Sequence, residues 1–348
     1  MQFKVIELNN PEWDEYVKSS YMYDFHHTSA YHKIEYSKGD EALLFVASSE
    51  INFIALPLIK RAIPDTIYFD ATSVYGYAGP ISSKALNEFP ENIISFFKEY
   101  FLKYCNDHKI ISIFSRLHPL IKQNLFFNSF GELKDLNKVV TIDLTEPVDV
   151  QRQHYSKSNK NQINQLKKKK GYSALILDSS DKEGILDFID VYTETMDRVN
   201  ANKFYYFDYE YFKSLLENKS FKSNLIAVYK DGKMCSAGIF TESNVIMQYH
   251  LSGTKNEFIK DKPMKLLLDE ARLLANTKGL KYFNLGGGVG GSDDDSLFQF
   301  KASFSKNFYQ FSVWNLVVNE DVYDRLNDEK KIKKEDYPNF FPLYRAKD

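Results

Sequence analysis

A glycine-rich segment near the C-terminal end of the chain is the first feature that could take part in chemistry. Residues 285–292 read Leu-Gly-Gly-Gly-Val-Gly-Gly-Ser and directly follow a strand-like run. Glycines at a strand end let backbone N–H groups approach a ligand closely, as they do in phosphate-binding loops. The segment lacks the lysine and hydroxyl of a Walker A loop and lies too late in the chain for a dinucleotide fingerprint. A ligand-binding turn and a surface loop remain the two interpretations.

A lysine among aromatic residues follows that segment. Lys301 stands between Phe298, Phe300 and Phe304, and the aspartates at 293–295 precede it. A cation held against apolar surroundings could offset negative charge that grows during a reaction, whereas a helix lysine that only reaches toward solvent is the alternative. The consecutive carboxylates favour helix capping over a metal site, because they cannot all point at one ion.

Two tyrosines precede a Gly-Pro pair in the first half of the chain. Residues 75–80 read Tyr-Gly-Tyr-Ala-Gly-Pro, which is typical of a strand end. Alternation along a strand would place Tyr75 and Tyr77 on one face. Because strand tyrosines are often half-buried packing residues, a packing role is the alternative to substrate binding.

Glu194 and Arg198 stand four residues apart in a helical pattern over residues 181–198. The two side chains could contact a substrate, or they could form a helix-surface ion pair, which contributes ~0.3–0.5 kcal/mol.

A second charged feature is the window at 151–170, which has seven Lys or Arg and no Asp or Glu and is predicted to be helical. It could grip the phosphates of a nucleotide sugar, coenzyme A or tRNA, or it could be a solvated helix face.

Other residues exclude several classes of protein. The seven histidines are scattered, no Gly-x-Ser-x-Gly occurs, and two cysteines cannot form a disulfide framework or a four-ligand zinc site. With 45 Lys and Arg against 47 Asp and Glu, the formal charge of −2 gives no global attraction to nucleic acid or anionic membranes. No stretch approaches the ~18–20 apolar residues of a membrane span, and the N-terminus lacks a signal-like apolar region. We therefore expect a cytoplasmic protein without a metal.

The expected secondary structure repeats along the chain. Each half is predicted to run helix, hairpin, strand, helix, strand, with the second hairpin turning at Asp231-Gly232. The length of 348 residues agrees with two domains at about 150 residues each. We predict a mixed α/β chain of two tandem domains, residues 1–150 and 151–348.

These segments together resemble the Fem-like branch of the GNAT acyltransferase superfamily. The resemblance rests on the segments 75–80, 158–167, 194–198 and 297–304 in that order, and Phe-Lys-x-x-Phe at 300–304 is the most specific of them. It covers nearly the whole chain. It implies two tandem GNAT-like domains, each a mixed β-sheet flanked by helices, with the active cleft between or beside them.

Members of this family move an acyl group onto an amine. Peptidoglycan-bridge members transfer an amino acid from aminoacyl-tRNA to the lysine of a cell-wall precursor, and other relatives use acyl-CoA or acyl-carrier protein. The resemblance implies that Lys301 stabilises the charge that develops on transfer. Bridge enzymes carry an arginine before the Gly-Pro pair, where this chain has Ala78, and residues 252–257 replace the usual pyrophosphate loop.

We therefore predict an N-acyltransferase that acylates an amine on a cell-wall or surface-polysaccharide precursor. The predicted catalytic residues are Lys301 and Tyr75, and the predicted substrate-binding residues are Tyr77, Gly79, Glu194, Arg198, Tyr249, His250, Gly287, Gly288 and Phe300. Acyl-CoA or aminoacyl-tRNA would be the co-substrate, with no permanently bound cofactor. The expected partners are a small-molecule, lipid-linked or nucleotide-linked glycan acceptor and tRNA, without integral membrane contact. A catalytically idle protein that binds a glycan precursor is the alternative, and an RNA-binding module would depend on residues 151–170 alone.

Overall fold

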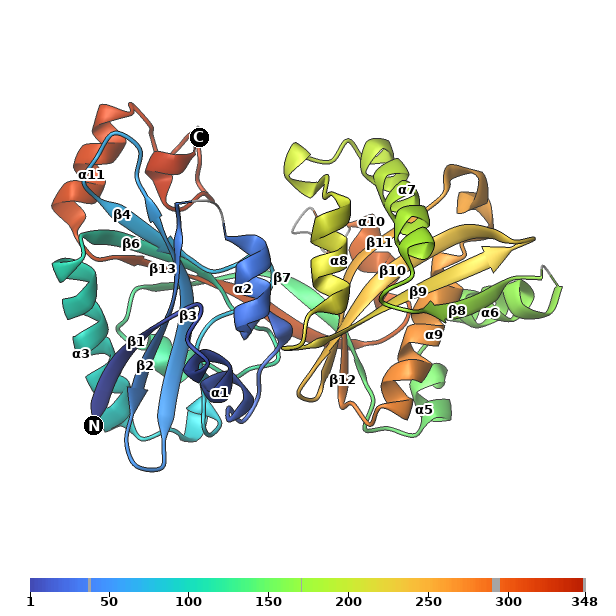
Figure 1. Cartoon of the computed structure of the whole chain (residues 1–348), viewed down its shortest axis with the longest axis horizontal. Helices are drawn as coiled ribbons and strands as arrows, with labels where there is room; N and C mark the ends of the chain where they lie inside the picture. The colour runs from blue at the N-terminus through green and yellow to red at the C-terminus, as the bar shows by residue number, and fades with distance from the viewer. Residues whose placement is uncertain (37–38, 170, 290–294, 347–348) are drawn as a thin grey trace. The chain divides into compact units, whose positions relative to one another are not determined.

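The computed structural model describes residues 1–36, 39–169, 171–289 and 295–346. The chain forms two compact units (Figure 1). Unit 1 comprises Met1–Leu136 and Gln310–Asp348, and unit 2 comprises Asn137–Tyr309. A division into two domains at residue 150 stays a prediction, and the structure adds that the segment after residue 309 packs with unit 1.

Unit 1 is built on a sheet with the strand order β1-β2-β3-β4-β6-β13. Its elements are β1 (Gln2–Glu7), α1 (Glu12–Lys18), η1 (Phe25–His27), α2 (Ser29–Glu35), β2 (Glu41–Ser48), β3 (Phe53–Ala62), β4 (Phe69–Thr72), β5 (Ile81–Ser82), η2 (Leu86–Glu88), α3 (Glu91–Asp107), β6 (Ile110–Arg116), α4 (Asn124–Phe127), α11 (Glu320–Glu329) and η5 (Leu343–Arg345). The strands pair antiparallel except for β4 and β6, which run parallel.

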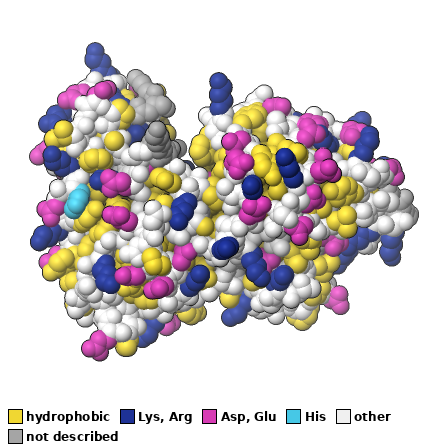
Figure 2. Space-filling model, viewed as in Figure 1, with side chains coloured by type: hydrophobic (Ala, Val, Ile, Leu, Met, Phe, Trp, Pro, Cys, Tyr) yellow, Lys and Arg dark blue, Asp and Glu magenta, His cyan; other side chains and the backbone are white. Residues whose placement is uncertain are grey.

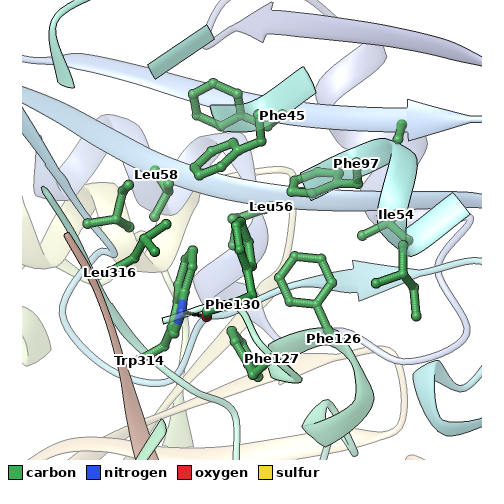
Figure 3. Packing of buried hydrophobic residues seen from close by; sticks show 14 of the residues in the cluster. Phe45, Ile54, Leu56, Leu58, Phe97, Phe126, Phe127, Phe130, Trp314 and Leu316 are labelled. Atoms are coloured by element: carbon green, nitrogen blue, oxygen red, sulfur yellow. Dashed lines mark hydrogen bonds between the residues drawn. The ribbon is translucent and has the colours of Figure 1, made fainter. Parts of the chain in front are cut away.

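The core of unit 1 forms where α3 packs on the sheet. Apolar residues at helical spacing, among them Ile93, Phe97 and Phe101, face the alternating apolar residues of β2 and β3. Trp314 of β13 closes this core and donates an indole hydrogen bond to the carbonyl oxygen of Phe130, as Figure 3 shows. β13 (Asn307–Val317) is therefore part of the core of unit 1.

Unit 2 has the strand order β7-β12-β11-β10-β9-β8. Its elements are β7 (Glu132–Asp143), which begins in unit 1, α5 (Val148–Gln153), α6 (Lys157–Lys169), β8 (Ser173–Leu177), α7 (Lys182–Arg198), η3 (Lys203–Tyr205), α8 (Tyr209–Glu217), β9 (Lys222–Lys230), β10 (Lys233–Ser243), β11 (Ile246–Thr254), η4 (Asn256–Asp261), α9 (Met264–Thr277), β12 (Tyr282–Gly286) and α10 (Ser296–Ala302). Here the parallel pair is β11 with β12, and the other pairs are antiparallel.

The two units repeat one plan, which confirms the predicted mixed α+β fold. In unit 1 the series is β1, α1, α2, β2, β3, β4, α3, β6, and in unit 2 it is β8, α7, α8, β9, β10, β11, α9, β12. In both, the last strand pairs parallel with the strand before the long helix. The predicted turn at Asp231-Gly232 is present, with positive φ of 51° and 78°.

One local prediction was wrong. Residues 75–80 are not a strand end: β4 ends at Thr72, and the segment bends through Gly76 and Gly79, whose φ angles of 111° and 96° break the alternation. The basic window is largely helical, as predicted, and the structure divides it between α5, which ends at Gln153, and α6, which starts at Lys157.

Positive and negative side chains are mixed on the face of the molecule that Figure 2 shows. Figure 2 shows Lys and Arg interspersed with Asp and Glu over the visible face, in keeping with the formal charge of −2. Within the described ranges, no helix combines the length and the apolar character that crossing a bilayer requires.

Candidate active site

The candidate site lies in unit 2, where β11 and β12 part. These parallel strands pair only from Ile246 to Gln248 and from Tyr282 to Asn284. Beyond that point β11 continues beside β10 as far as Thr254, whereas Gly286 of β12 pairs with Val140 of β7. The residues that follow Gln248 and Asn284 therefore border a gap in the sheet.

Lys301 of α10 reaches both borders of this gap. Its Nζ donates a hydrogen bond of 2.7 Å to the carbonyl oxygen of Gly287, directly after β12, and lies 5.4 Å from the ring centroid of Tyr249 on β11. The side chain is only 8% exposed. Burial lowers the pKa of Lys301 to about 7, an effect that the Asp295 carboxylate partly opposes. Lys301 is thus a buried amine that changes charge near neutral pH, which a lysine reaching into solvent would not do.

The glycines predicted to contact substrate allow α10 to approach β12 closely. Asp295 caps α10 by accepting a hydrogen bond of 2.8 Å from the backbone N–H of Phe298. A Cβ atom on Gly288 would lie 2.2 Å from Asp295 Oδ1, and one on Gly287 would lie 2.7 Å from Asn137 Nδ2. Small residues are required here by packing. The rest of the glycine-rich segment and two of the three aspartates, residues 290–294, lie outside the described residues.

Packing and hydrogen bonds hold the Tyr249 side chain in place beside Lys301. Its ring stacks on Phe240 with centroids 5.5 Å apart, and its hydroxyl bonds Ser252 and, at 3.5 Å, the sulfur of Met264. Burial raises the pKa of Tyr249 to about 12, so it stays protonated near neutral pH. The next residue, His250, is half-buried at an irregularity in the pairing of β10 with β11.

A cavity of about 500 Å³ adjoins α10, the helix that carries Lys301. It is lined by Ser156, Ser158, Asn159, Arg198, Thr254, Ile259, Lys262, Met264, Lys265, Gln299, Phe300 and Ser303. Arg198, Lys262 and Lys265 are cations, and none of the described residues lining the cavity is Asp or Glu. Asn159 is 1% exposed, and its Oδ1 has no hydrogen-bond partner among the described residues. The arrangement suits a ligand that combines anionic groups with an apolar stretch.

Glu194 and Arg198 do not form the helix-surface ion pair that their spacing allows. Glu194 accepts a hydrogen bond of 2.5 Å from the backbone N–H of Asn256 and pairs with Lys255 at 3.1 Å. Arg198 donates to Asn256 Oδ1 at 2.6 Å and to the carbonyl oxygen of Thr254 at 3.0 Å. Both side chains therefore hold the loop that follows β11, and Arg198 also lines the cavity.

The predicted residues Tyr75, Tyr77 and Gly79 belong to unit 1 and are described there. The guanidinium carbon of Arg116 lies over the ring of Tyr75, 5.7 Å from the ring centroid. The Tyr77 ring packs edge-on against Phe311, with the two ring centroids 5.2 Å apart. A Cβ atom on Gly79 would lie 2.4 Å from the Gln123 side chain. These contacts show how unit 1 holds the segment, and the substrate-binding role of its residues stays a prediction.

A buried histidine cluster supports the same segment, although the scattered histidines gave no indication of it. Asp24 accepts hydrogen bonds from His26 Nδ1 at 3.2 Å and His118 Nε2 at 3.1 Å. Burial alone would raise the pKa of Asp24, but the bonds from His118 and His26 outweigh it, so this pKa lies well below its usual value. A Cβ atom on Gly76 would lie 2.0 Å from His26 Nε2, so the cluster directly underlies the turn.

Within unit 2, the structure brings Lys301, Tyr249, Gly287 and Gly288 together, with Phe300 and Arg198 at the adjoining cavity. Sequence reasoning missed Lys262, Lys265 and Asn159. The sequence did offer one indication of Lys262, because it precedes Pro263 at a predicted helix start, and the N-terminus of a helix favours a negatively charged ligand.

Comparisons with known proteins identify the class of fold. No family model and no curated protein matches the sequence. The chain has the tandem GNAT fold. FemX is 14% identical with a TM-score of 0.73, over 93% of this chain and 99% of that one. The C-terminal domain of a putative lysylphosphatidylglycerol synthetase from Agrobacterium fabrum is 15% identical with a TM-score of 0.53, over 80% and 85%. A tandem GNAT protein from the clavulanic acid biosynthesis pathway is 9% identical with a TM-score of 0.50, over 91% and 99%. The predicted Fem-like resemblance is confirmed at the level of the fold.

Proposed function

We propose that this chain is an N-acyltransferase that moves an acyl or aminoacyl group from a phosphate-bearing donor to an amine of a cell-wall or surface-polysaccharide precursor. One observation carries the proposal: the buried Lys301 amine lies where β11 and β12 part, on the same short helix that lines a cation-bearing cavity. The similarity of this chain to the C-terminal domain of a putative lysylphosphatidylglycerol synthetase supports transfer to a cell-envelope component.

The cavity is the proposed donor site. Lys262 and Lys265 would pair with phosphate oxygens, and Ile259, Met264 and Phe300 would contact the apolar part of the donor. Both acyl-CoA and the 3′ end of aminoacyl-tRNA combine phosphates with an activated carbonyl group. Because α10 supplies Phe300 to the cavity and Lys301 to the gap, the carbonyl of a donor bound there would be placed near the Lys301 ammonium.

The proposed reaction needs no protein nucleophile. The neutral acceptor amine attacks the donor carbonyl, a C–N bond forms, and the carbonyl oxygen becomes an oxyanion that protonated Lys301 stabilises. The oxyanion then collapses, the bond to the donor's sulfur or oxygen breaks, and the proton lost by the amine nitrogen leaves with the carrier or solvent. Tyr249, held by Phe240 and Ser252, would keep the lysine in place.

Calorimetric titration of the full chain tests the donor site. Acetyl-CoA, longer acyl-CoAs, aminoacyl-tRNA, uncharged tRNA and a nucleotide sugar are compared. We expect an acyl-bearing donor to bind and Lys262→Asn to weaken it, since asparagine tolerates the positive φ of 58° at this position while removing the charge. Lys168→Asn, on the exposed side of α6, is the control and should leave binding unchanged. If no donor binds, or if both variants bind as the wild type does, the proposed donor site is wrong.

A further inference from the structure

The start of α6 holds the C-terminal end of α10 through Ser303, the residue that directly follows α10. The carbonyl oxygen of Ser303 accepts hydrogen bonds from the backbone N–H of Ser156 at 2.8 Å and from Asn159 Nδ2 at 3.1 Å. The Ser303 hydroxyl accepts from Asn159 Nδ2 at 2.6 Å and donates to the carbonyl oxygen of Phe300. Asn159 is therefore linked to the last turn of α10 by a continuous series of hydrogen bonds.

The orientation of the Asn159 amide group is fixed by these contacts. A carbonyl oxygen only accepts hydrogen bonds, so the atom that faces the carbonyl of Ser303 must be Nδ2 and not Oδ1. Asn159 is 1% exposed, and hydrogen bonds that water does not reach are stronger than those at the surface. The contact between Asn159 and Ser303 is thus both directional and protected from solvent.

α10 depends on contacts at both of its ends. It has only seven residues, and a helix of this length is not stable in water by itself. Asp295 holds the N-terminal end through the N–H of Phe298, and Asn159 holds the C-terminal end through Ser303. Lys301 lies two residues before Ser303, so the place of its side chain depends on the C-terminal contact.

The same contact forms part of the cavity wall. Asn159 and Ser156 line the cavity from α6 and the residue before it, and Phe300 and Ser303 line it from α10 and the residue after it. A ligand in the cavity therefore lies against both sides of the contact between Asn159 and Ser303. This contact connects the proposed donor site with the helix that carries Lys301.

We propose that Asn159 is a positioning residue, which acts through Ser303 to hold Lys301 where it meets the carbonyl group of a donor in the cavity; this inference rests on the proposed function. Without the bonds from Asn159, the end of α10 is free to move away from α6. The Lys301 amine then loses its place between the Gly287 carbonyl oxygen and the Tyr249 ring. Because a displacement of about 1 Å can reduce a rate about 100-fold, the loss should appear mainly in turnover.

The pKa of Lys301 reports its position without any donor. Burial lowers this pKa to about 7, and in Asn159→Ala it should rise toward 10.5, because a displaced α10 lets water reach the amine. NMR titration of the Lys301 ε-carbon, assigned with Lys301→Met, measures the value. The titratable groups Asp295 and Tyr249, which lie near Lys301, are unchanged in this variant. Asn164→Ala is the matched control, since Asn164 is an exposed asparagine of the same helix with a side-chain hydrogen bond of its own.

Acyl transfer provides the second measurement. Asn159→Ala should lower turnover about 10- to 100-fold and leave the dissociation constant of the donor nearly unchanged, because a side chain that is 1% exposed offers the donor little surface. Ser303→Ala keeps the carbonyl oxygen and should lose less. Since Asn159 and Ser303 act through one contact, the double variant should be no slower than Asn159→Ala alone. Thermal melting shows which variants are folded, and Ser303→Ala supplies the same two measurements if Asn159→Ala is not.

Two results would overturn the role of Asn159. One is a pKa of Lys301 that stays at about 7 in the folded variants. The other is a double variant whose loss of turnover equals the product of the two single losses, as expected for residues that act independently. A raised pKa of Lys301 in a protein that transfers no acyl group from any donor would contradict the proposed function alone. An unchanged pKa in variants that transfer as the wild type does would contradict the role of Asn159 alone.

Discussion

The Nζ of Lys301 donates a hydrogen bond of 2.7 Å to the carbonyl oxygen of Gly287. This bond joins α10 to the residue that follows β12, and Tyr249 confines the lysine from the side of β11. The lysine is therefore held in a site that disfavours its charge, since one neutral carbonyl replaces the water around an ammonium group. A residue placed at such a cost is more readily explained by chemistry than by packing.

Lys301→Met should stabilise the folded protein. The unfolded state binds a proton at the ordinary lysine pKa of 10.5, whereas the folded state does so only below about 7. The cost of burial is therefore fully present below pH ~7 and falls as pH rises toward 10.5, so wild-type stability should rise over that window. The difference between these two pKa values corresponds to a gain in stability of about 4–5 kcal/mol at most for Lys301→Met. Loss of the hydrogen bond to Gly287 makes the net gain smaller.

Differential scanning calorimetry across this pH window checks the prediction. The variant should melt higher than the wild type at slightly acid pH, and the two should converge at alkaline pH. Lys306→Met replaces an exposed lysine near α10 and should show no such convergence. An unchanged or lower Tm for Lys301→Met at acid pH would show that the buried amine is not destabilising.

Gly288→Ala should displace α10. The added Cβ would lie 2.2 Å from Asp295 Oδ1, which caps the helix at the N–H of Phe298. Loss of such a cap costs ~1 kcal/mol, and the movement of Lys301 should reduce acyl transfer further. Val289→Ala, at the next position and 85% exposed, serves as the control. Thermal melting and transfer rates would contradict the prediction if both variants behaved alike.

Unit 1 should unfold in mild acid. Burial lowers the pKa of His27 to about 3 and that of His32 to about 4, from 6.5. Below pH 6.5 the unfolded state therefore binds protons that the folded state does not, and stability falls as pH drops toward 4. The chain has two tryptophans, Trp13 and Trp314, and both lie in unit 1, so tryptophan fluorescence follows this unit specifically.

His32→Gln should move the acid transition to lower pH, because one buried titrating group is removed. The exposed His108→Gln should leave the transition in place. An acid midpoint that is the same in the wild type and His32→Gln would mean that His32 does not contribute to the acid sensitivity of unit 1.

Tyr344→Phe should loosen the C-terminal segment. The Tyr344 hydroxyl bonds Ser112 Oγ at 2.7 Å and the buried carboxylate of Asp70 at 3.1 Å, which Arg61 also holds at 2.9 Å. Removing the hydroxyl leaves buried partners less satisfied and should cost ~1–3 kcal/mol. Urea unfolding followed by tryptophan fluorescence measures this loss, with Tyr21→Phe, 66% exposed, as the control. Equal midpoints for the two variants would rule out a stabilising role for this contact.

Repeating patterns made much of the fold predictable. The hairpin turn at Asp231-Gly232 and the apolar periodicity of α9 depend on short-range preferences that a sequence displays directly. The tyrosine segment was misread because its glycines adopt positive φ, which the alternation of aromatic residues concealed. The return of Tyr344 to Asp70 depends on a contact between residues 274 positions apart, which no local pattern indicates.

The candidate site was predictable in part for the same reason. Lys301 was singled out because its aromatic neighbours suggested a shielded cation, and the structure places it 8% exposed. Lys262, Lys265 and Arg198 meet only through the packing of α7, η4 and α9 at one cavity.

The pH dependence of acyl transfer by wild type, Lys301→Met and Lys301→Arg tests the central claim most directly, once a donor has been identified by titration. If protonated Lys301 stabilises the oxyanion, the contribution of the lysine should decline above its pKa of about 7. Lys301→Met should lose about 10²–10³ in turnover, and Lys301→Arg should recover part of the rate and keep its charge at alkaline pH. Turnover by Lys301→Met equal to that of the wild type at every pH would contradict the account.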